Sequence, residues 1–310
     1  MSTELESIAH EFGISLPFEL GLKKNEREDI MRIGSLDNPN DIKEAVTRIK
    51  SGQTIAFQVR NVFGLIVDGK NGEAVKNMQG LKGMKPDKSR PFSGMLPGRK
   101  FATLIDSNSV HPNIKPLLDE PKRYSLILGM LCHVRAPIRI NIVNNIPDSM
   151  ISFTGVTAYM HNLDPHGHLI ENLVTELEAA GVEYPCITTA NTTKVEREIS
   201  NIKDAIKFCS LQRNKGKIPI LLQDRTVTRP EALGSFPILD ITYRSDGSLN
   251  LIRHGHVPTL VLEKVLRIKI DQTTAKKAVY AQPEFEDFHM MEGSPEELRL
   301  KAIAYLGSVK

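Results

Sequence analysis

The stretch from Thr54 to Pro97 constrains the fold more than any other part of this sequence. Its first half is apolar and predicts a buried strand, which runs into a turn at Gly64 and then a short helix. A loop with six basic residues and one acid follows, from Lys82 to Lys100. Such a loop suits a phosphate or another anion. The alternative is a solvated surface loop, since most charge runs are solvated faces.

Composition sets limits on the class of protein. The 310 residues suffice for one large domain with additions or for two small ones. The formal net charge of +3 argues against a general polyanion binder but permits a local basic cleft. No apolar run approaches 18 residues, so we expect no membrane span, and the acidic, mixed N-terminus does not resemble a secretory signal. The widely spaced Cys132, Cys186 and Cys209 indicate reduced thiols and a cytoplasmic protein.

Strand and helix patterns alternate unevenly, which favours an α/β fold with a mixed sheet. Asp41 and Glu44 are typical of a capping box at a helix start, and Gly52 is placed to end that helix. Further helices are predicted at 169–177 and 202–209, and another begins at Pro258. Further strands are predicted at 139–143, 156–160, 185–189, 218–222, 238–243 and 249–252, the last two joined by a turn at 245–247. Residues 101–121 read as loop with a short helix, and a last helix starts near Ser294.

The stretch that begins at Gly52 resembles the signature of the YrdC-like family, the threonylcarbamoyl-AMP synthases and their relatives. That signature is a glycine before a strand, P-T-D/E-T-V-Y-G-L, a helix, and K-G-R-P-x-x-x-P-L. Here Val62-Phe63-Gly64-Leu65 stands for V-Y-G-L. Lys82-Gly83 opens the basic loop and Arg90-Pro91-Phe92 closes it.

Three further blocks match this family in the right order. Thr188-Thr189-Ala190-Asn191, preceded by Pro185, corresponds to T-S-A-N at the end of a strand. Ser235-Phe236-Pro237-Ile238-Leu239-Asp240 corresponds to S-T-hydrophobic-hydrophobic-D, and Ile252-Arg253-His254-Gly255 to L-R-P-G. The likeness covers roughly residues 36–265. We therefore predict a helical N-terminal extension at 1–35, a YrdC-like domain at 36–265 and a helical C-terminal tail at 266–310.

The resemblance implies a twisted mixed sheet with flanking helices around a basic cleft. Family members bind ATP, threonine and bicarbonate, with Mg²⁺ accompanying ATP. They form threonylcarbamoyl-adenylate for tRNA modification, and family domains have been associated with double-stranded RNA. By resemblance, the nucleotide and phosphate site comprises Lys82, Lys85, Arg90, Thr189, Asn191, Ser235 and Arg253. Alternatives are a strand end with a helix cap for Thr189 and Asn191, and a surface position for Arg253.

The amino-acid side of the site departs from the family. Its predicted residues are Val59, Asn61 and Phe63, where Val59 replaces a threonine and Phe63 a tyrosine. The P-G-x-x-T and R-x-P segments, read at 133–137 and 159–162, have lost their characteristic residues. Lost hydroxyls weaken selection for the same substrate, since one such hydrogen bond can carry about 10⁴-fold discrimination. The phosphate side is therefore better preserved than the amino-acid side, and no catalytic residue is assigned.

Three functions stay open. The first is a synthase of the threonylcarbamoyl-adenylate type, or a related carbamoyl- or adenylate-forming enzyme with another acceptor. The second is an RNA-binding module, and the third a non-catalytic nucleotide sensor. The pairs His166/His168 and His254/His256 invite a metal-site reading, but we interpret them as loop histidines and predict no metal site. The sequence leaves the acceptor, the oligomeric state and the role of residues 266–310 undefined.

Overall fold

The structure is a computed structural model of the chain. It describes residues 31–59, 62–84, 91–120, 132–152, 155, 157–162, 168–192, 198–211, 214–224, 236–255, 257–276 and 297. These residues fall into two compact units. The first takes its described residues from Met1–Asp87 and Thr175–Glu231, and the second from Lys88–Val174 and Ala232–Lys310.

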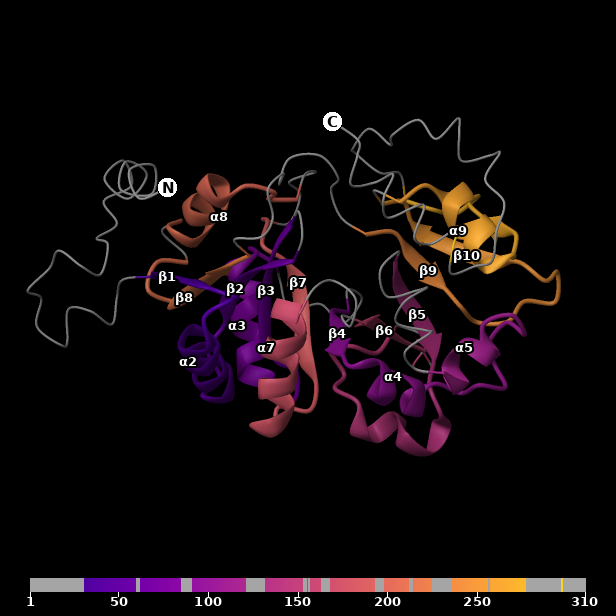
Figure 1. Cartoon of the computed structure of the whole chain (residues 1–310), viewed down its shortest axis with the longest axis horizontal. Helices are drawn as coiled ribbons and strands as arrows, with labels where there is room; N and C mark the ends of the chain where they lie inside the picture. Colours follow the sequence, from indigo (N-terminus) through magenta and orange to yellow (C-terminus); the bar gives the residue numbers. More distant parts are fainter. Residues whose placement is uncertain are drawn as a thin grey trace, which may run out of the picture. The chain divides into compact units, whose positions relative to one another are not determined.

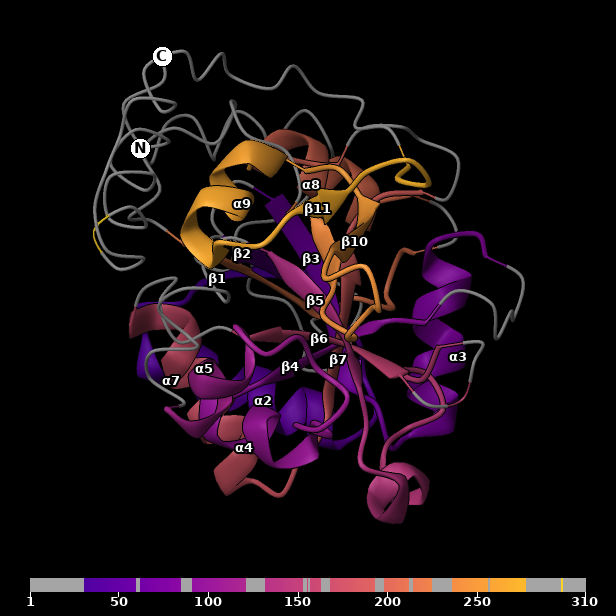
Figure 2. The ribbon, with the colours of Figure 1, turned by 90° about the vertical axis from the view of Figure 1, so that its right-hand side faces the viewer.

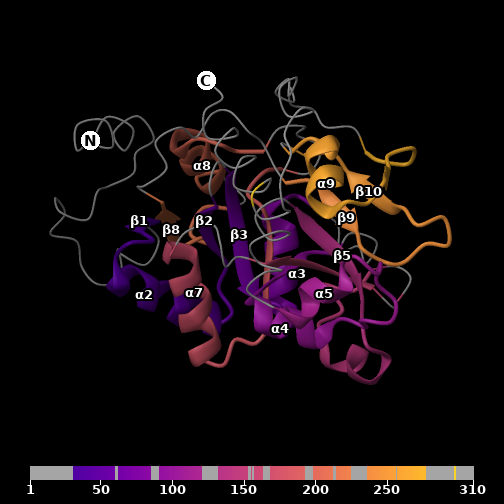
Figure 3. The same ribbon diagram turned by 45° about the vertical axis from the view of Figure 1, so that its right-hand side comes forward.

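A mixed sheet with the strand order β1-β8-β2-β3-β7 forms the centre of the first unit (Figure 1). β1, β8 and β2 run parallel, whereas β3 is antiparallel to both β2 and β7. Figure 3 shows β2 and β3 side by side. The elements in chain order are β1 (Arg32–Ser35), α2 (Pro39–Lys50), β2 (Ile55–Val59), β3 (Val62–Asp68), α3 (Gly72–Leu81), α7 (His168–Ala179), β7 (Pro185–Thr189), α8 (Ile202–Cys209) and β8 (Ile220–Gln223). The division between the units falls within α7.

The strands β2 and β3 are apolar throughout because both of their faces are covered. Every residue of β2 is buried, and so is every residue of β3 except Asp68. The helices α2 and α3 contact β3, each with an apolar face turned inward. Continuous apolar runs of this kind are typical of strands covered on both faces.

The N-cap of helix α2 lies three residues before Asp41, the predicted cap. Asn38 is the N-cap, its side chain accepts a hydrogen bond from the Asn40 backbone, and Pro39 occupies the first turn. Asp41 is buried instead, and its carboxylate accepts hydrogen bonds from the Ser35 amide at 2.7 Å and from Arg32 at 2.8 Å. The predicted cap was therefore wrong, because this carboxylate ties α2 to the end of β1.

Gly64 lies in the middle of β3, where a turn was predicted. The chain reverses earlier, between Val59 at the end of β2 and Val62 at the start of β3. A Cβ atom at Gly64 would lie 3.1 Å from the Phe57 ring and 3.1 Å from the Thr188 carbonyl oxygen. The glycine is thus required by close packing between neighbouring strands, and a glycine inside a strand often has this cause.

A second mixed sheet, in the order β4-β6-β5-β9-β10-β11, forms the second unit. β4 is parallel to β6, β5 to β9 and β10 to β11, while β5/β6 and β9/β10 are antiparallel. Figure 2 shows α9 beside β11. The elements are β4 (Ser93–Leu96), α4 (Gly98–Leu104), α5 (Lys115–Asp119), β5 (His133–Pro137), the 3₁₀ helix η3 (Ile140–Asn145), β6 (Thr157–Asn162), β9 (Ile238–Asp240), β10 (Leu249–Arg253), α9 (Thr259–Leu266) and β11 (Ile270–Asp271).

Several predictions within the second unit were wrong in placement. The predicted strand at 139–143 is mostly 3₁₀ helix, and Ile140 is 80% exposed, so its apolar pattern is not a buried strand face. The strand lies earlier, at β5. The predicted loop from Lys82 to Lys100 contains the strand β4 and the start of α4. Residues Gly94 to Leu96 of β4 are buried. Pro258 is the N-cap of α9 rather than its first residue.

The predicted fold class is confirmed: the protein is a mixed α/β protein with two mixed sheets and helices. The β9/β10 hairpin, β6, β7, β8, α7 and α8 lie where the sequence predicted them, within a few residues. The last four residues of the predicted N-terminal extension form β1, and its first 30 lie outside the described residues. The apolar segment Tyr124–Leu131 and the predicted tail helix near Ser294, apart from Glu297, also lie outside them. The domain boundaries stay a prediction.

We predict that Gly64→Val lowers the free energy of unfolding by about 1–3 kcal/mol, because extra methyl groups must displace Phe57 or the β7 backbone. Urea denaturation measures the change. The control is Gly72→Ala at the start of α3, where a Cβ atom meets nothing within 4 Å. Equal midpoints for the two variants would contradict the packing role of Gly64.

Candidate functional site

Lys82 follows the last residue of α3 and is the C-cap of this helix. Its backbone amide donates to Gln79, and Gly83 takes a positive φ of 66° that turns the chain away. The amide of Met84 also donates to the Gln79 carbonyl at 3.0 Å. The helix end therefore fixes the Lys82 backbone, and the side chain, which is only 6% exposed, points into the first unit.

The ammonium group of Lys82 reaches the end of β7. Its Nζ donates to the backbone oxygen of Thr189, to Thr189 Oγ1 at 3.4 Å and to Asn191 Oδ1 at 3.1 Å. Thr189 Oγ1 in turn donates to Asn191 Oδ1. The structure thus brings together three of the predicted site residues, although 107 positions separate Lys82 from Thr189.

The strand ladder fixes the acceptor side of this contact. Thr189 pairs with Gly64, and the amide of Ala190 donates to the Phe63 carbonyl at 2.8 Å. The last residues of β7 therefore continue the pairing with β3 up to the point where Asn191 leaves the sheet. The predicted match of this segment to a strand end is confirmed, whereas its functional role stays a prediction.

The chemistry of the Lys82 contact suits an anion site. An ammonium group taken out of water must be hydrogen-bonded, and Lys offers three donors. The acceptors named above are a carbonyl, a hydroxyl and an amide oxygen, all of them uncharged. They orient the ammonium group at the end of β7. A phosphate or carboxylate placed there would take the place of the longest contact, that with Thr189 Oγ1 at 3.4 Å, and form a charge-assisted hydrogen bond.

The two predicted pocket residues of the β2–β3 hairpin are buried in the core. Val59 is 5% exposed and pairs with Val62, and Phe63 is 1% exposed. The amide of Phe63 donates to the Ile199 carbonyl at 2.8 Å. The neighbouring Gln58 is also buried, and its Oε1 accepts from the Asp224 amide at 3.1 Å. In the described residues, therefore, Val59 and Phe63 contribute to the core of the first unit.

The remaining predicted site residues are not placed beside Lys82. Arg253 ends β10 in the second unit, where its Nη2 donates to the Phe236 carbonyl at 2.7 Å. Its convergence with Lys82 stays a prediction. Lys85, Arg90, Ser235 and Asn61 lie outside the described residues.

The described part of the chain contains neither a reactive thiol nor a cluster of metal-ligating side chains. Cys132, Cys186 and Cys209 are free and buried, and burial raises the pKa of the Cys132 and Cys209 thiols to about 12, which keeps them protonated and unreactive. No group of three or more His, Cys, Asp or Glu side chains that could hold a metal ion occurs among the described residues. His166 and His256 lie outside them. In the same residues, every helix is too short or too polar to cross a membrane.

Comparison with family models and with curated proteins finds no match. Solved structures do match. A doubly substituted Sua5 from P. abyssi shares 18% identity at a TM-score of 0.56, and the match covers 77% of this chain and 65% of that one. Sua5 from P. abyssi complexed with L-threonine shares 18% identity at a TM-score of 0.54, with 78% and 63% covered. YciO from E. coli shares 13% identity at a TM-score of 0.54, with 73% and 96% covered.

These likenesses establish the fold of the chain. It has the YrdC/Sua5-like fold that its sequence blocks predicted. The chain spans less than two thirds of the length of the two Sua5 chains that it matches.

We predict that Phe63→Tyr lowers the free energy of unfolding by about 1–3 kcal/mol, because the new hydroxyl enters the core without a prepared partner. Thermal or urea unfolding measures it. The matched change is Tyr243→Phe at a side chain that is half exposed, where removal of the hydroxyl leaves stability nearly unchanged. An undiminished stability of Phe63→Tyr would show that this position faces an open polar pocket.

Proposed function

We propose that this chain is an ATP-using nucleotidyltransferase of the threonylcarbamoyl-adenylate synthase type, with an acceptor that differs from threonine. The observation that carries the proposal is the ammonium group of Lys82, held buried against Thr189 and Asn191 at the end of β7. The likeness in fold to Sua5, one structure of which is complexed with L-threonine, supports it. So does the order of the sequence blocks.

In the proposed reaction, an amine and bicarbonate condense to a carbamate with loss of water, and a carbamate oxygen attacks the α-phosphate of ATP. The bond to the β-phosphate breaks, and pyrophosphate leaves. Negative charge develops on the phosphate oxygens, and catalysis of such transfers depends on positioning and on cations that face this charge. Lys82 would supply one such cation from a fixed position. Thr189 and Asn191 would hold its ammonium group in place, and ATP would arrive with Mg²⁺ bound through its phosphates.

Lys85, Arg90, Ser235 and Arg253 are proposed to complete the phosphate site. They provide three cations and one hydroxyl, the groups that bind phosphate oxygens. A location in the cytoplasm, where ATP and tRNA are available, fits this proposal.

The acceptor is proposed to differ from threonine because the hairpin lacks the hydroxyls of the family signature. Val59 and Phe63 are buried and apolar, so neither offers a hydrogen bond to a substrate hydroxyl. A site that loses such a bond discriminates poorly in favour of the hydroxylated substrate. The acceptor would therefore be an amine or amino acid that needs no hydroxyl contact from this hairpin.

A second candidate is a protein that binds the nucleotide without turning it over. The same observation favours it, since a phosphate side that is better preserved than the acceptor side suits a nucleotide sensor. Binding of RNA, including double-stranded RNA, is the further alternative and predicts an affinity that falls steeply with salt.

Pyrophosphate release distinguishes these candidates. The purified chain is incubated with ATP, Mg²⁺, bicarbonate and each of a panel of amino acids, and pyrophosphate is measured. The proposal predicts release that requires both bicarbonate and an amine. Nucleotide binding with no release under any acceptor would support the sensor. The absence of nucleotide binding would contradict both.

We predict that Lys82→Ala weakens nucleotide binding about tenfold or more. A hydrogen bond to a charged group contributes roughly 1.5–3 kcal/mol, and about 1.4 kcal/mol corresponds to tenfold in affinity. Titration calorimetry measures the change. Lys76→Ala is the matched control, because Lys76 lies on the same helix, is 63% exposed and pairs with Glu73. If the two variants bound the nucleotide with equal affinity, Lys82 would not be part of the nucleotide site.

A further inference from the structure

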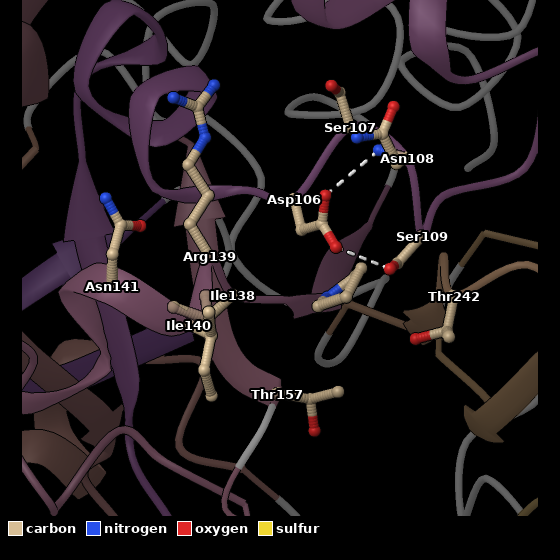
Figure 4. Close-up of a pocket in the computed structure, with 11 residues that line it drawn as sticks. Asp106, Ser107, Asn108, Ser109, Ile138, Arg139, Ile140, Asn141, Thr157 and Thr242 are labelled. Carbon is tan, nitrogen blue, oxygen red and sulfur yellow. Dashed lines mark hydrogen bonds between the residues drawn. The ribbon is translucent and has the colours of Figure 1, made fainter.

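A pocket of about 570 Å³ lies in the second unit, and none of its lining residues belongs to the predicted site (Figure 4). Its walls come from the segment after α4, from the segment after β5 and from the first residue of β6. The volume is within the usual range of small-molecule sites, about 300–1,000 Å³. Residues 101–121 were predicted as loop with a short helix, a pattern that gives no sign of this pocket.

Strand direction separates this pocket from Arg253. β9 runs antiparallel to β10, with Ile238 opposite Arg253 and Asp240 opposite Asn250. β5 is parallel to β9, so its start at His133 lies beside Ile238. The pocket lies at the opposite end of these strands, because Pro137 ends β5 and Thr242 follows β9. It is therefore a different site from the one proposed around Arg253.

The pocket places two opposite charges on one face of a short antiparallel ladder. Ile105 and Ile138 form a bridge, and the amide of Asp106 donates to the Pro137 carbonyl at 3.0 Å. Arg139 stands two residues beyond Pro137, so it is the diagonal neighbour of Asp106 on the same face. Diagonal neighbours are roughly 7–8 Å apart at the backbone. Within the described residues, Asp106 and Arg139 form no ion pair with each other.

Both charged groups keep bonding capacity. Asp106 accepts from Ser109 Oγ at 2.5 Å and from the Asn108 amide at 3.1 Å, as Figure 4 shows. These two bonds, with Arg139 and Lys115 nearby, hold the pKa of Asp106 below its usual value, so the carboxylate is ionised at neutral pH. A carboxylate offers about four acceptor sites and a guanidinium five donors. Arg139 uses its Nε on the Ile105 carbonyl at 2.9 Å, which leaves its Nη atoms for a ligand.

The rest of the wall is part polar and part apolar. The buried Oγ1 of Thr242 has no hydrogen-bond partner among the described residues. Because this hydroxyl is closed off from the pocket space, Thr242 contributes to the shape of the wall and not to the hydrogen bonds of an occupant. Ile138 and Ile140 also line the pocket (Figure 4), Ile138 being buried and Ile140 80% exposed. An exposed isoleucine at the rim offers apolar surface to an occupant.

We propose that this pocket binds a small zwitterion with an apolar side chain, either a free amino acid or a dipeptide. Its ammonium group would contact Asp106, its carboxylate would contact Arg139, and its side chain would lie against Ile138 and Ile140. A simple anion such as phosphate would meet the Asp106 carboxylate, and a simple amine would meet the Arg139 guanidinium. A zwitterion satisfies both charges.

Titration calorimetry with L-leucine and with L-leucyl-L-leucine tests the proposal and distinguishes its two sources. The parent chain is expected to bind at least one of them. Isoamylamine, which lacks the carboxylate, and 4-methylpentanoate, which lacks the ammonium group, should each bind at least about tenfold more weakly. Equal binding of either single-charge analogue, or no binding of both zwitterions, would overturn the proposal.

Variants locate the binding and separate it from the proposed ATP site. Asp106→Asn and Arg139→Gln should each weaken the zwitterion at least about tenfold. Asp119→Asn, at an exposed carboxylate of the same unit outside the pocket, and Lys82→Ala should leave it unchanged. Binding that is lost in Lys82→Ala but kept in both pocket variants would overturn the proposal. Because Lys82→Ala is expected to lose nucleotide and to keep the zwitterion, failure at one site is distinguishable from failure at the other.

Discussion

The contact of the buried Lys82 ammonium group with the end of β7 is the interaction on which the proposed site depends. A charge that is removed from water is tolerated only when it is hydrogen-bonded, and the end of β7 supplies the acceptors through Thr189 and Asn191. Those acceptors are in place because β7 pairs with β3 and because Ala190 continues the ladder to Phe63. The helix α3, the central hairpin and β7 are therefore joined at one point, where a positive charge is held in a defined position.

Local pattern predicted the elements of the fold better than their ends. The apolar pattern located α7 and α8, and a turn between two strand patterns located the β9/β10 hairpin, because these local signals agree with the tertiary structure there. The same reasoning failed at Gly64, since a glycine required by strand packing looks like a turn glycine in the sequence. It failed again at 139–143, where an apolar alternation belongs to an exposed 3₁₀ helix. Both errors concern what packs against a residue, which local sequence does not record.

For the candidate sites too, some contacts could be predicted from the sequence and others could not. The contact of Lys82 with Thr189 and Asn191 could be predicted only from the order of the family-like blocks, because no local pattern links residues 107 positions apart. The burial of Val59 and Phe63 could not be predicted from their identity as pocket residues. Asp106 and Arg139 lie on the same face because of an isolated bridge between Ile105 and Ile138. A single bridge produces no periodic pattern in the sequence.

A crystal structure of the chain with a non-hydrolysable ATP analogue and Mg²⁺ tests the central claim most directly. The account predicts a phosphate oxygen within about 3.2 Å of Lys82 Nζ, the range of a hydrogen bond, with Thr189 and Asn191 still in contact with the same ammonium group. A nucleotide bound elsewhere, with Lys82 contacting only protein atoms, would contradict it.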